Sequence, residues 1–208
     1  MSTKLERDFY LQPTLTVACD LLGKLFVVKK RGGSLSGRIV ETEAYIGQDD
    51  LACHARSGRT RRNWVMFEQG GLTYVYFVYG MYNMLNIVAE PKDAPAAVLI
   101  RALEPVDGIK AMQRRRGTTD LRALTSGPGK LCQALGITVA DSGRDLTENG
   151  WHVIDDGHKV EQIGRSGRIG IREATEKLWR FYDEESRFVS GPKSVQPRRT
   201  MKKTMKEN

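Results

Sequence analysis

The segment RIVETEAY (residues 38–45) places two glutamates on alternate positions of a strand-like sequence. Alternate side chains of a β-strand share a face, so Ile39, Glu41, Glu43 and Tyr45 are predicted to lie together. A carboxylate can take a proton from water, and an aromatic ring beside it can stack on a flat heterocycle. The pattern indicates a carboxylate set beside an aromatic platform, suited to the removal of such a heterocycle. A solvent-facing strand whose two glutamates do no chemistry is the alternative.

A basic segment, HARSGRTRRNW (residues 54–64), follows along the chain. It begins with His54 and carries four arginines among small and polar residues: Arg56, Arg59, Arg61 and Arg62. A flexible and strongly positive loop of this kind is suited to contacts with nucleic-acid phosphates. A charge run on a surface loop is more often only solvated, so the interpretation depends on the segment that comes next.

That next segment holds four tyrosines within nine positions: Tyr74, Tyr76, Tyr79 and Tyr82. Strand-like runs at 72–78 and 82–88 flank Tyr79-Gly80-Met81, which predicts a β-hairpin with Tyr79 at its tip. Aromatic residues on a strand face, such as Tyr74 and Tyr76, most often belong to a core. A tip residue buries little, however, and a side chain there can insert between the base steps of a duplex.

The chain has 208 residues, 40% of them hydrophobic and 28% charged, which is typical of one globular domain with a substantial core. A formal net charge of +8 and a pI near 9.5 favour a polyanionic partner. No apolar run approaches the roughly 20 residues of a membrane span, and the first residues lack the apolar centre of a signal peptide. We therefore expect a cytoplasmic protein, associated with the nucleoid if it is bacterial.

The cysteines and histidines do not form a recognisable metal or disulfide pattern. Cys19, Cys53 and Cys132 are scattered and odd in number, so a disulfide framework is not expected. No CxxC pair or metal-ligand spacing of histidines occurs, and neither a GxGxxG fingerprint nor a GxxxxGK[ST] loop is found. The sequence thus predicts no metal and no organic cofactor.

Hydrophobic periodicity and turn residues predict a single mixed α/β domain over residues 1–190. The predicted helices are 13–23, with Gly23 as its C-terminal cap, 107–116, 130–135 and 173–182; the predicted strands are 24–30, 36–46, 72–78, 82–88, 96–103 and 160–171. Residues 191–208 are polar and basic, with almost nothing to bury. They are predicted to form a disordered tail.

Taken together, these segments resemble the alkyladenine (3-methyladenine) DNA glycosylase family, of the mammalian type that is also found in bacteria. The resemblance covers about residues 9–190. Its strongest blocks are RIVETEAYIG, TYVYFVYGMYNMLNI, VLIRALEP, SGPGKLCQALGI and LWRFYDEESRFVS, in that order along the chain. Several long blocks in the right order are far more specific than one short motif. The resemblance implies a compact domain with a curved, mostly antiparallel sheet, surrounding helices and a protruding hairpin that enters the DNA minor groove.

The resemblance also implies roles for single residues. Glu43 matches the general base that deprotonates the attacking water, and Arg101 matches the arginine that helps to hold this water and the glutamate. Tyr45, His54 and Tyr76 match the side chains that enclose the flipped base.

Outside the base pocket, Tyr79 matches the wedge that fills the gap in the duplex. Asn86 matches the asparagine that discriminates between purines, and Lys130, at the start of a predicted helix, suits a phosphate contact. The basic loop after His54 is one residue shorter than in the mammalian relatives, and residues 143–164 match poorly. These departures concern DNA contacts rather than the chemistry.

The implied protein is a monomeric and monofunctional DNA glycosylase. It would flip an alkylated or deaminated purine out of duplex DNA and hydrolyse the N-glycosidic bond, leaving an abasic site. The implied substrates are 3-methyladenine, 7-methylguanine, hypoxanthine and ethenoadenine. A lyase would require an amine nucleophile, and no lysine falls among the matched pocket positions. The residues do not assign an acid that protonates the leaving base.

Two other functions compete with this interpretation. A non-catalytic nucleic-acid-binding module would explain the basic loop and the tyrosines, but not Glu43 and Arg101 beside them. A metal-dependent nuclease could use Glu41, Glu43, Asp49 and Asp50, and it would lose activity in EDTA.

Overall fold

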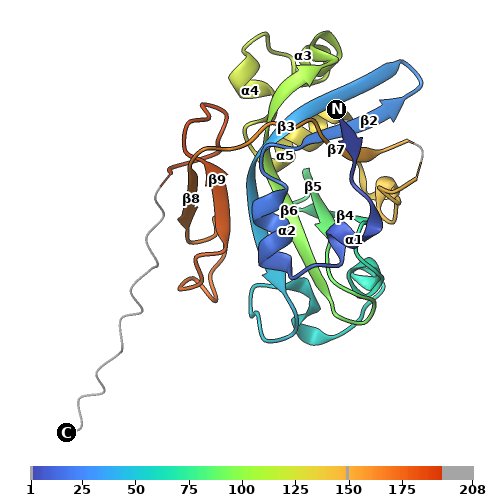
Figure 1. Ribbon diagram of the computed structural model, residues 1–208, viewed down its shortest axis with the longest axis vertical. Helices are drawn as coiled ribbons and strands as arrows, with labels where there is room; N and C mark the ends of the chain where they lie inside the picture. The colour runs from blue at the N-terminus through green and yellow to red at the C-terminus, as the bar shows by residue number, and fades with distance from the viewer. Residues whose placement is uncertain (1, 149, 194–208) are drawn as a thin grey trace, which may run out of the picture.

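The computed structural model describes residues 2–148 and 150–193, which form one mixed α/β domain built on a large open sheet (Figure 1). The strands are β1 (Thr3–Lys4), β2 (Leu25–Lys30), β3 (Gly33–Ile46), β4 (Thr73–Val78), β5 (Tyr82–Val88), β6 (Ala96–Asp107), β7 (His152–Asp155), β8 (Ile163–Ser166) and β9 (Arg180–Asp183). Their order is β1-β7-β2-β3-β6-β5-β4, with β9 also pairing with β3 and β8 with β9. Every strand pair described is antiparallel, in agreement with the fold predicted from the sequence.

Short helices surround this sheet: α1 (Arg7–Tyr10), α2 (Thr14–Asp20), α3 (Ile109–Arg116), α4 (Leu121–Thr125) and α5 (Pro128–Leu135), together with the 3₁₀ turns η1 (His54–Ser57), η2 (Trp64–Phe67) and η3 (Val139–Asp141). Figure 1 shows α3 and α4 at one end of β6 and the loops after β3 at the opposite end. Within the described residues, no helix combines the length and the apolar character needed to cross a membrane.

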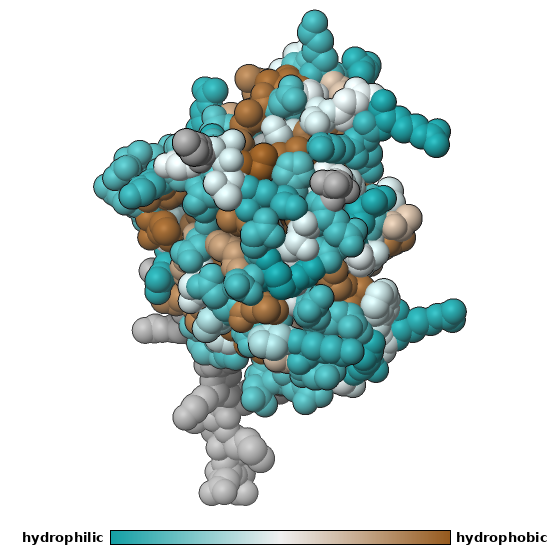
Figure 2. All heavy atoms as spheres, turned by 45° about the vertical axis from the view of Figure 1, so that its right-hand side comes forward, coloured by the Kyte–Doolittle hydropathy of each residue, from teal (hydrophilic) through white to brown (hydrophobic). Residues whose placement is uncertain are grey.

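The main core lies between the sheet and the helices α2 and α5, which pack on β3, β5 and β6. A second apolar cluster, around Cys53, Met66, Tyr74 and Ala97, lies beneath the turns η1 and η2. On the face shown in Figure 2, hydrophilic side chains separate the apolar surface into small groups. The second cluster matters most for function because it supports the basic loop.

The central strands β3 and β6 contain paired irregularities that change which residues share a face. Ile39 lies opposite Leu103, Glu41 opposite Ala102 and Thr42 opposite Ile100, so that the register shifts on both sides of Glu41. An extra residue in a strand reverses the alternation of its side chains beyond that point. The prediction that Ile39 shares a face with the glutamates is therefore wrong: Ile39 is in the main core, whereas Glu41 and Glu43 both face Arg101.

Near the C-terminus the predicted elements were partly wrong. Residues 173–182 form no helix: 173–179 are a loop, and 180–182 belong to β9, whose residues pair with β3 and β8. The predicted strand 160–171 is reduced to β8. Arg180 and Phe181 are buried against the sheet, and this pairing requires an extended backbone. The contacts with the sheet therefore outweigh the helical periodicity of 173–182.

Other predicted elements hold, with boundaries that differ by a few residues. Helix α2 ends at Asp20, and Gly23 is not its cap; its backbone N–H instead donates to the carbonyl of Ile39. The strands β1 and β7 and the helices α1 and α4 were not predicted. The tail prediction concerns residues 194–208 almost entirely, which lie outside the described residues, so it stays a prediction.

Candidate active site

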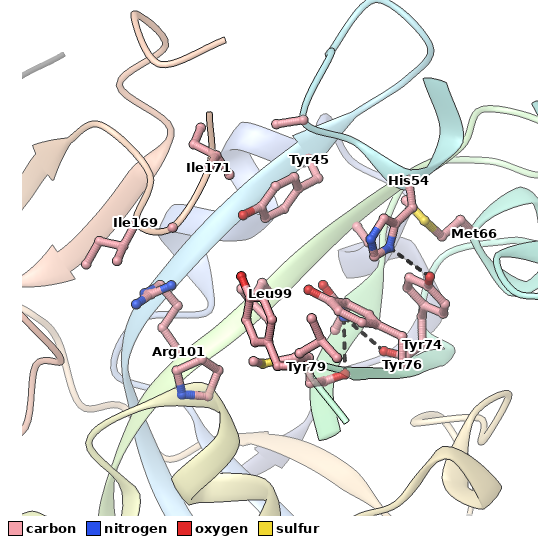
Figure 3. Close-up of a pocket in the computed structure, with 17 residues that line it drawn as sticks. Tyr45, His54, Met66, Tyr74, Tyr76, Tyr79, Leu99, Arg101, Ile169 and Ile171 are labelled. Atoms are coloured by element: carbon pink, nitrogen blue, oxygen red, sulfur yellow. Dashed lines mark hydrogen bonds between the residues drawn. The ribbon is translucent and has the colours of Figure 1, made fainter. Parts of the chain in front are cut away.

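A cavity of about 320 Å³ opens between the central strands, the β4–β5 hairpin and the loop after β8 (Figure 3). Its walls include six of the predicted site residues: Tyr45, His54, Tyr76, Tyr79, Asn86 and Arg101. They come from β3, η1, β5, β6 and the β4–β5 hairpin, so distant segments meet here. The volume is within the usual range for a small-molecule pocket.

Glu43 lies directly behind this wall and is completely buried. Its Oε1 accepts a hydrogen bond from the backbone N–H of Ile169 at 2.7 Å and lies 3.2 Å from Nη1 of Arg101. Its Oε2 accepts from the hydroxyl of Tyr45 at 2.8 Å. Burial excludes the alternative of a solvent-facing strand. Because a carboxylate oxygen has two acceptor positions, Oε2 can still accept a hydrogen bond from a water.

Glu41, two residues before Glu43 on β3, is also fully buried. Its Oε1 accepts from Nε of Arg101 at 2.8 Å and from Nε of Arg180 at 2.7 Å. Its Oε2 accepts from the backbone N–H of Ser190 at 2.6 Å. The two glutamates and the two arginines therefore form one buried ionic network, which explains how a core can hold charges on this strand face.

Tyr45 is held between the cavity and a buried ion pair. The guanidinium of Arg168 lies 4.6 Å from the centre of the Tyr45 ring and makes two hydrogen bonds of 2.6 and 2.7 Å to the carboxylate of Asp50. Burial alone would raise the pKa of Asp50, but the hydrogen bonds and charge of Arg168 outweigh it and lower this pKa. Burial and the neighbouring Glu43 raise the pKa of the Tyr45 phenol, so it stays protonated and donates to Glu43.

His54 forms the opposite wall with Tyr74 and Tyr76. Its Nδ1 lies 2.9 Å from the hydroxyl of Tyr74, and its ring stands edge-on to Tyr76 with centroids 4.5 Å apart (Figure 3). Desolvation against these rings, together with the charge of Arg62, lowers the pKa of His54 to about 4. The imidazole is therefore neutral at physiological pH.

The lowered pKa predicts a stability effect in acid. Between about pH 6.5 and pH 4 the unfolded chain takes up a proton at His54 that the folded protein does not bind, so folding stability falls as the pH falls through this range. We expect a His54→Gln variant to show a smaller loss of melting temperature between pH 7 and pH 4.5 than the wild type. His158→Gln, at an exposed residue, is the control. An unchanged pH dependence in His54→Gln would show that the imidazole is not desolvated.

Asn86 completes the cavity from β5. It is buried, and its amide nitrogen donates to the carbonyl oxygen of Tyr74 at 3.0 Å. This bond fixes the plane of the amide within the wall, where a rigid polar group can discriminate between ligands by their own polar groups.

The basic loop is anchored by a single buried asparagine. Asn63 donates to the carbonyl oxygens of His54 and Gly58, at 2.8 and 3.0 Å, and accepts from the backbone N–H of Thr60 at 2.6 Å. These contacts give the loop a defined shape, which fixes His54 in the cavity wall. The loop therefore has a defined structure and is not simply a solvated series of charged residues.

The predicted phosphate-binding side chains are all exposed: Arg56, Arg59, Arg61, Arg62 and Lys130. Arg56 forms an ion pair with Glu173 and Arg59 with Glu68, both at the surface, where such pairs contribute little. The guanidinium of Arg62 lies 5.3 Å from the centre of the Tyr76 ring, at the edge of the cavity.

The β4–β5 hairpin places apolar side chains in solvent. Tyr79 is 75% exposed, and Phe77, Met81 and Tyr82 are also exposed. Tyr79 and Gly80 both have positive φ, and the N–H of Met81 donates to the carbonyl of Val78, which closes a tight turn. A positive φ is uncommon for a tyrosine. The structure thus confirms the predicted hairpin and the position of Tyr79 at its tip.

Sequence reasoning missed the residues that hold the site from behind: Arg168, Ile169, Arg180 and Ser190. Arginines inside the apolar runs RIGI (168–171) and LWRFY (178–182) were the available signal, because an arginine among core residues requires a buried partner. The partners themselves could not be identified from such a pattern.

Three of the four carboxylates proposed for a nuclease are paired with arginines. Glu41, Glu43 and Asp50 each contact a buried arginine. Throughout residues 2–148 and 150–193, no group of three or more histidine, cysteine, aspartate or glutamate side chains is placed to hold a metal ion.

Comparison with known proteins gives a consistent match over nearly the whole chain. A family model described as Methylpurine-DNA glycosylase (MPG) matches residues 8–187. A protein of Methanocella arvoryzae is 51% identical over 190 residues, covering 89% of this chain and 95% of that protein. One of Chlorobaculum tepidum is 47% identical over 207 residues, covering 99% of each. Both carry the name "Putative 3-methyladenine DNA glycosylase".

Proposed function

This chain belongs to the methylpurine-DNA glycosylase family, and from this premise we propose that it excises damaged purines from duplex DNA by hydrolysis. The proposed substrates are alkylated purines such as 3-methyladenine and 7-methylguanine, and the neutral lesions hypoxanthine and ethenoadenine. A base inside a duplex cannot be reached at its sugar bond, so the reaction would require the damaged nucleotide to be flipped into the cavity.

The observation that carries the proposal is the position of Glu43 behind an aromatic cavity. Tyr45 on one side, and His54 with Tyr76 on the other, offer rings on which a flipped base could stack. Glu43 adjoins this space through Tyr45, Arg101 and Ile169. A flat heterocycle held there would bring its sugar bond close to a buried carboxylate.

In the proposed reaction, Glu43 takes a proton from a water that attacks the sugar carbon. The bond to the purine breaks, and its electron pair leaves with the base. The carboxylate also stabilises the positive charge that develops on the sugar. An alkylated purine that already carries positive charge leaves readily, so these steps suffice for it. Among the described residues that line the cavity there is no lysine, which supports hydrolysis rather than an amine-based lyase reaction.

The test is incubation with a panel of duplexes, each carrying one defined lesion, in EDTA, with the released base identified. We expect free damaged purine and an alkali-labile abasic site, with no covalent adduct after borohydride treatment. Binding without release would favour a non-catalytic module. Strand cleavage that requires a divalent cation would favour a nuclease.

We further propose that Tyr79 fills the gap left by the flipped nucleotide. The Tyr79 side chain is 75% exposed at a tight hairpin tip, so its ring has little to pack against in the free protein. An apolar side chain presented in this way is suited to insertion between base steps.

Tyr79→Ser should therefore leave the melting temperature nearly unchanged and lower single-turnover excision from a fully paired duplex. A lesion that is already unpaired should be affected less, because its extrusion costs less. Tyr76→Ala is the control: it removes part of the cavity wall and should slow excision in both contexts. A drop of several degrees in the melting temperature of Tyr79→Ser would rule out the wedge, since burial of a large aromatic is worth about 3 kcal/mol or more.

A further inference from the structure

We infer that Glu41 is a positioning residue for the excision reaction, acting through Arg101 together with Ser190 from the C-terminal segment. This inference rests on the proposed function, in which Glu43 is the general base. Neither Glu41 nor Ser190 is placed to touch a base in the cavity, so any effect on the chemistry would be indirect.

Arg101 is held at three of its nitrogens, each by a different residue. Its Nε donates to Glu41 at 2.8 Å, its Nη2 donates to the hydroxyl of Ser190 at 3.2 Å, and its Nη1 lies 3.2 Å from Glu43. A planar guanidinium bound at three positions cannot rotate about its own bonds. The contact with Glu41 is a hydrogen bond between charged groups and the shortest of the three, so Glu41 helps to set where Nη1 lies relative to Glu43.

Ser190 is itself fixed at every polar atom by the same network. Its N–H donates to Glu41 at 2.6 Å, its carbonyl accepts from Nη2 of Arg180 at 3.0 Å, and its hydroxyl accepts from Arg101. Arg180 in turn donates to Glu41 at 2.7 Å. The segment after β9 thereby closes over the back of the site, and Glu41 is the carboxylate that joins this segment to Arg101.

The charges in the network balance, two carboxylates against two guanidiniums. In Glu41→Gln, Glu43 would be the only carboxylate left in the network, against two arginines. This would loosen Arg101, so that its Nη1 is no longer held in a fixed position beside Glu43. The effect acts on the chemical step and not on the stacking surfaces. A misplacement of about 1 Å near reacting groups can lower a rate by about 100-fold.

The experiment measures single-turnover excision and the Kd for lesion duplex separately, using the lesion that the wild type excises fastest. We expect Glu41→Gln to slow excision by about 10- to 100-fold and to change the Kd by less than about three-fold. In an Arg101→Ala background the same change should slow excision by less than about two-fold more, because Glu41 acts through that arginine. Effects that multiply in the double variant would overturn the inference.

A matched pair of serine variants keeps the test valid if Glu41→Gln folds poorly. Ser190 and Ser166 are both buried, and each hydroxyl contacts one buried arginine: Ser190 contacts Arg101 and Ser166 contacts Arg180 at 2.9 Å. Ser190→Ala should slow excision by about three- to ten-fold, and Ser166→Ala by less than about two-fold. Equal rates in the two variants would show that the contact with Arg101 has no effect on the chemistry.

Failure of this inference can be told apart from failure of the proposed function. If the wild-type protein releases no base from any lesion duplex, the proposed function itself is wrong. If the wild type is active and Glu41→Gln, correctly folded, excises at the wild-type rate, only the positioning role is wrong.

Discussion

Replacing Glu43 by glutamine is expected to abolish most excision while leaving the fold and the binding of lesion DNA intact. General acid–base catalysis contributes about 10²- to 10⁴-fold, and an amide cannot accept the proton from water, so the single-turnover rate should fall by about that factor. The glutamine oxygen can still accept from the N–H of Ile169 and from Arg101, and its nitrogen can donate to the hydroxyl of Tyr45.

The measurements are single-turnover excision, the Kd for a lesion duplex and the melting temperature. Glu104→Gln is the control, because Glu104 lies on β6, only partly buried, and does not line the cavity. Excision by Glu43→Gln at a rate close to that of the wild type would contradict the assignment of the general base.

The second large effect is expected on stability, at the ion pair behind Tyr45. The side chains of Asp50 and Arg168 are both completely inaccessible to solvent. Asp50→Asn would leave the guanidinium buried without a counter-charge, which typically costs about 3–5 kcal/mol. For a chain of this size that corresponds to a melting temperature lower by roughly 6–20 °C.

The chain offers a control with the same chemistry at the surface. Asp156 also makes two hydrogen bonds to one arginine, Arg38, at 3.0 and 2.9 Å, but both side chains are partly exposed. Asp156→Asn should cost about 1 kcal/mol or less, because water solvates the remaining charge. Similar losses in the two variants, measured by thermal or urea unfolding at pH 7, would show that burial does not set the cost.

The pH dependence of this pair has a definite sign. The pKa of Asp50 is lower in the folded protein than in the unfolded chain, so the unfolded chain binds a proton first as the pH falls. The stability contributed by the pair is therefore complete above about pH 4, the ordinary value for an aspartate, and is lost as the pH falls through the lower pKa of the folded state.

Several features of the site follow from short-range sequence patterns alone. The Tyr79-Gly80 turn between two strand-like runs was sufficient to predict the hairpin and its exposed tip. Alternation along 41–45 correctly grouped Glu41, Glu43 and Tyr45. These predictions succeeded because strand alternation and turn geometry depend on residues only a few positions apart.

The alternation failed at Ile39 for a physical reason. The extra residue in β3 at this point is accommodated by a matching irregularity in β6, about 60 positions further along the chain. No local pattern in RIVETEAY marks it, because a bulge is set by the register of two strands together. The predicted helix at 173–182 failed similarly, since its last three residues are extended in β9 through pairing with β3.

The chemistry-bearing side chains, the basic character and the hairpin tip were thus determined by the sequence itself. The tertiary structure decided which charges meet: Arg168 with Asp50, separated by 118 positions, Arg180 with Glu41, separated by 139, and Ser190 with Glu41, separated by 149. Buried charges are tolerated only when an opposite charge is within hydrogen-bonding distance. Whether two distant residues reach that distance depends on how whole strands pack, so the partners that hold Glu43 and Arg101 in place became visible only in the folded chain.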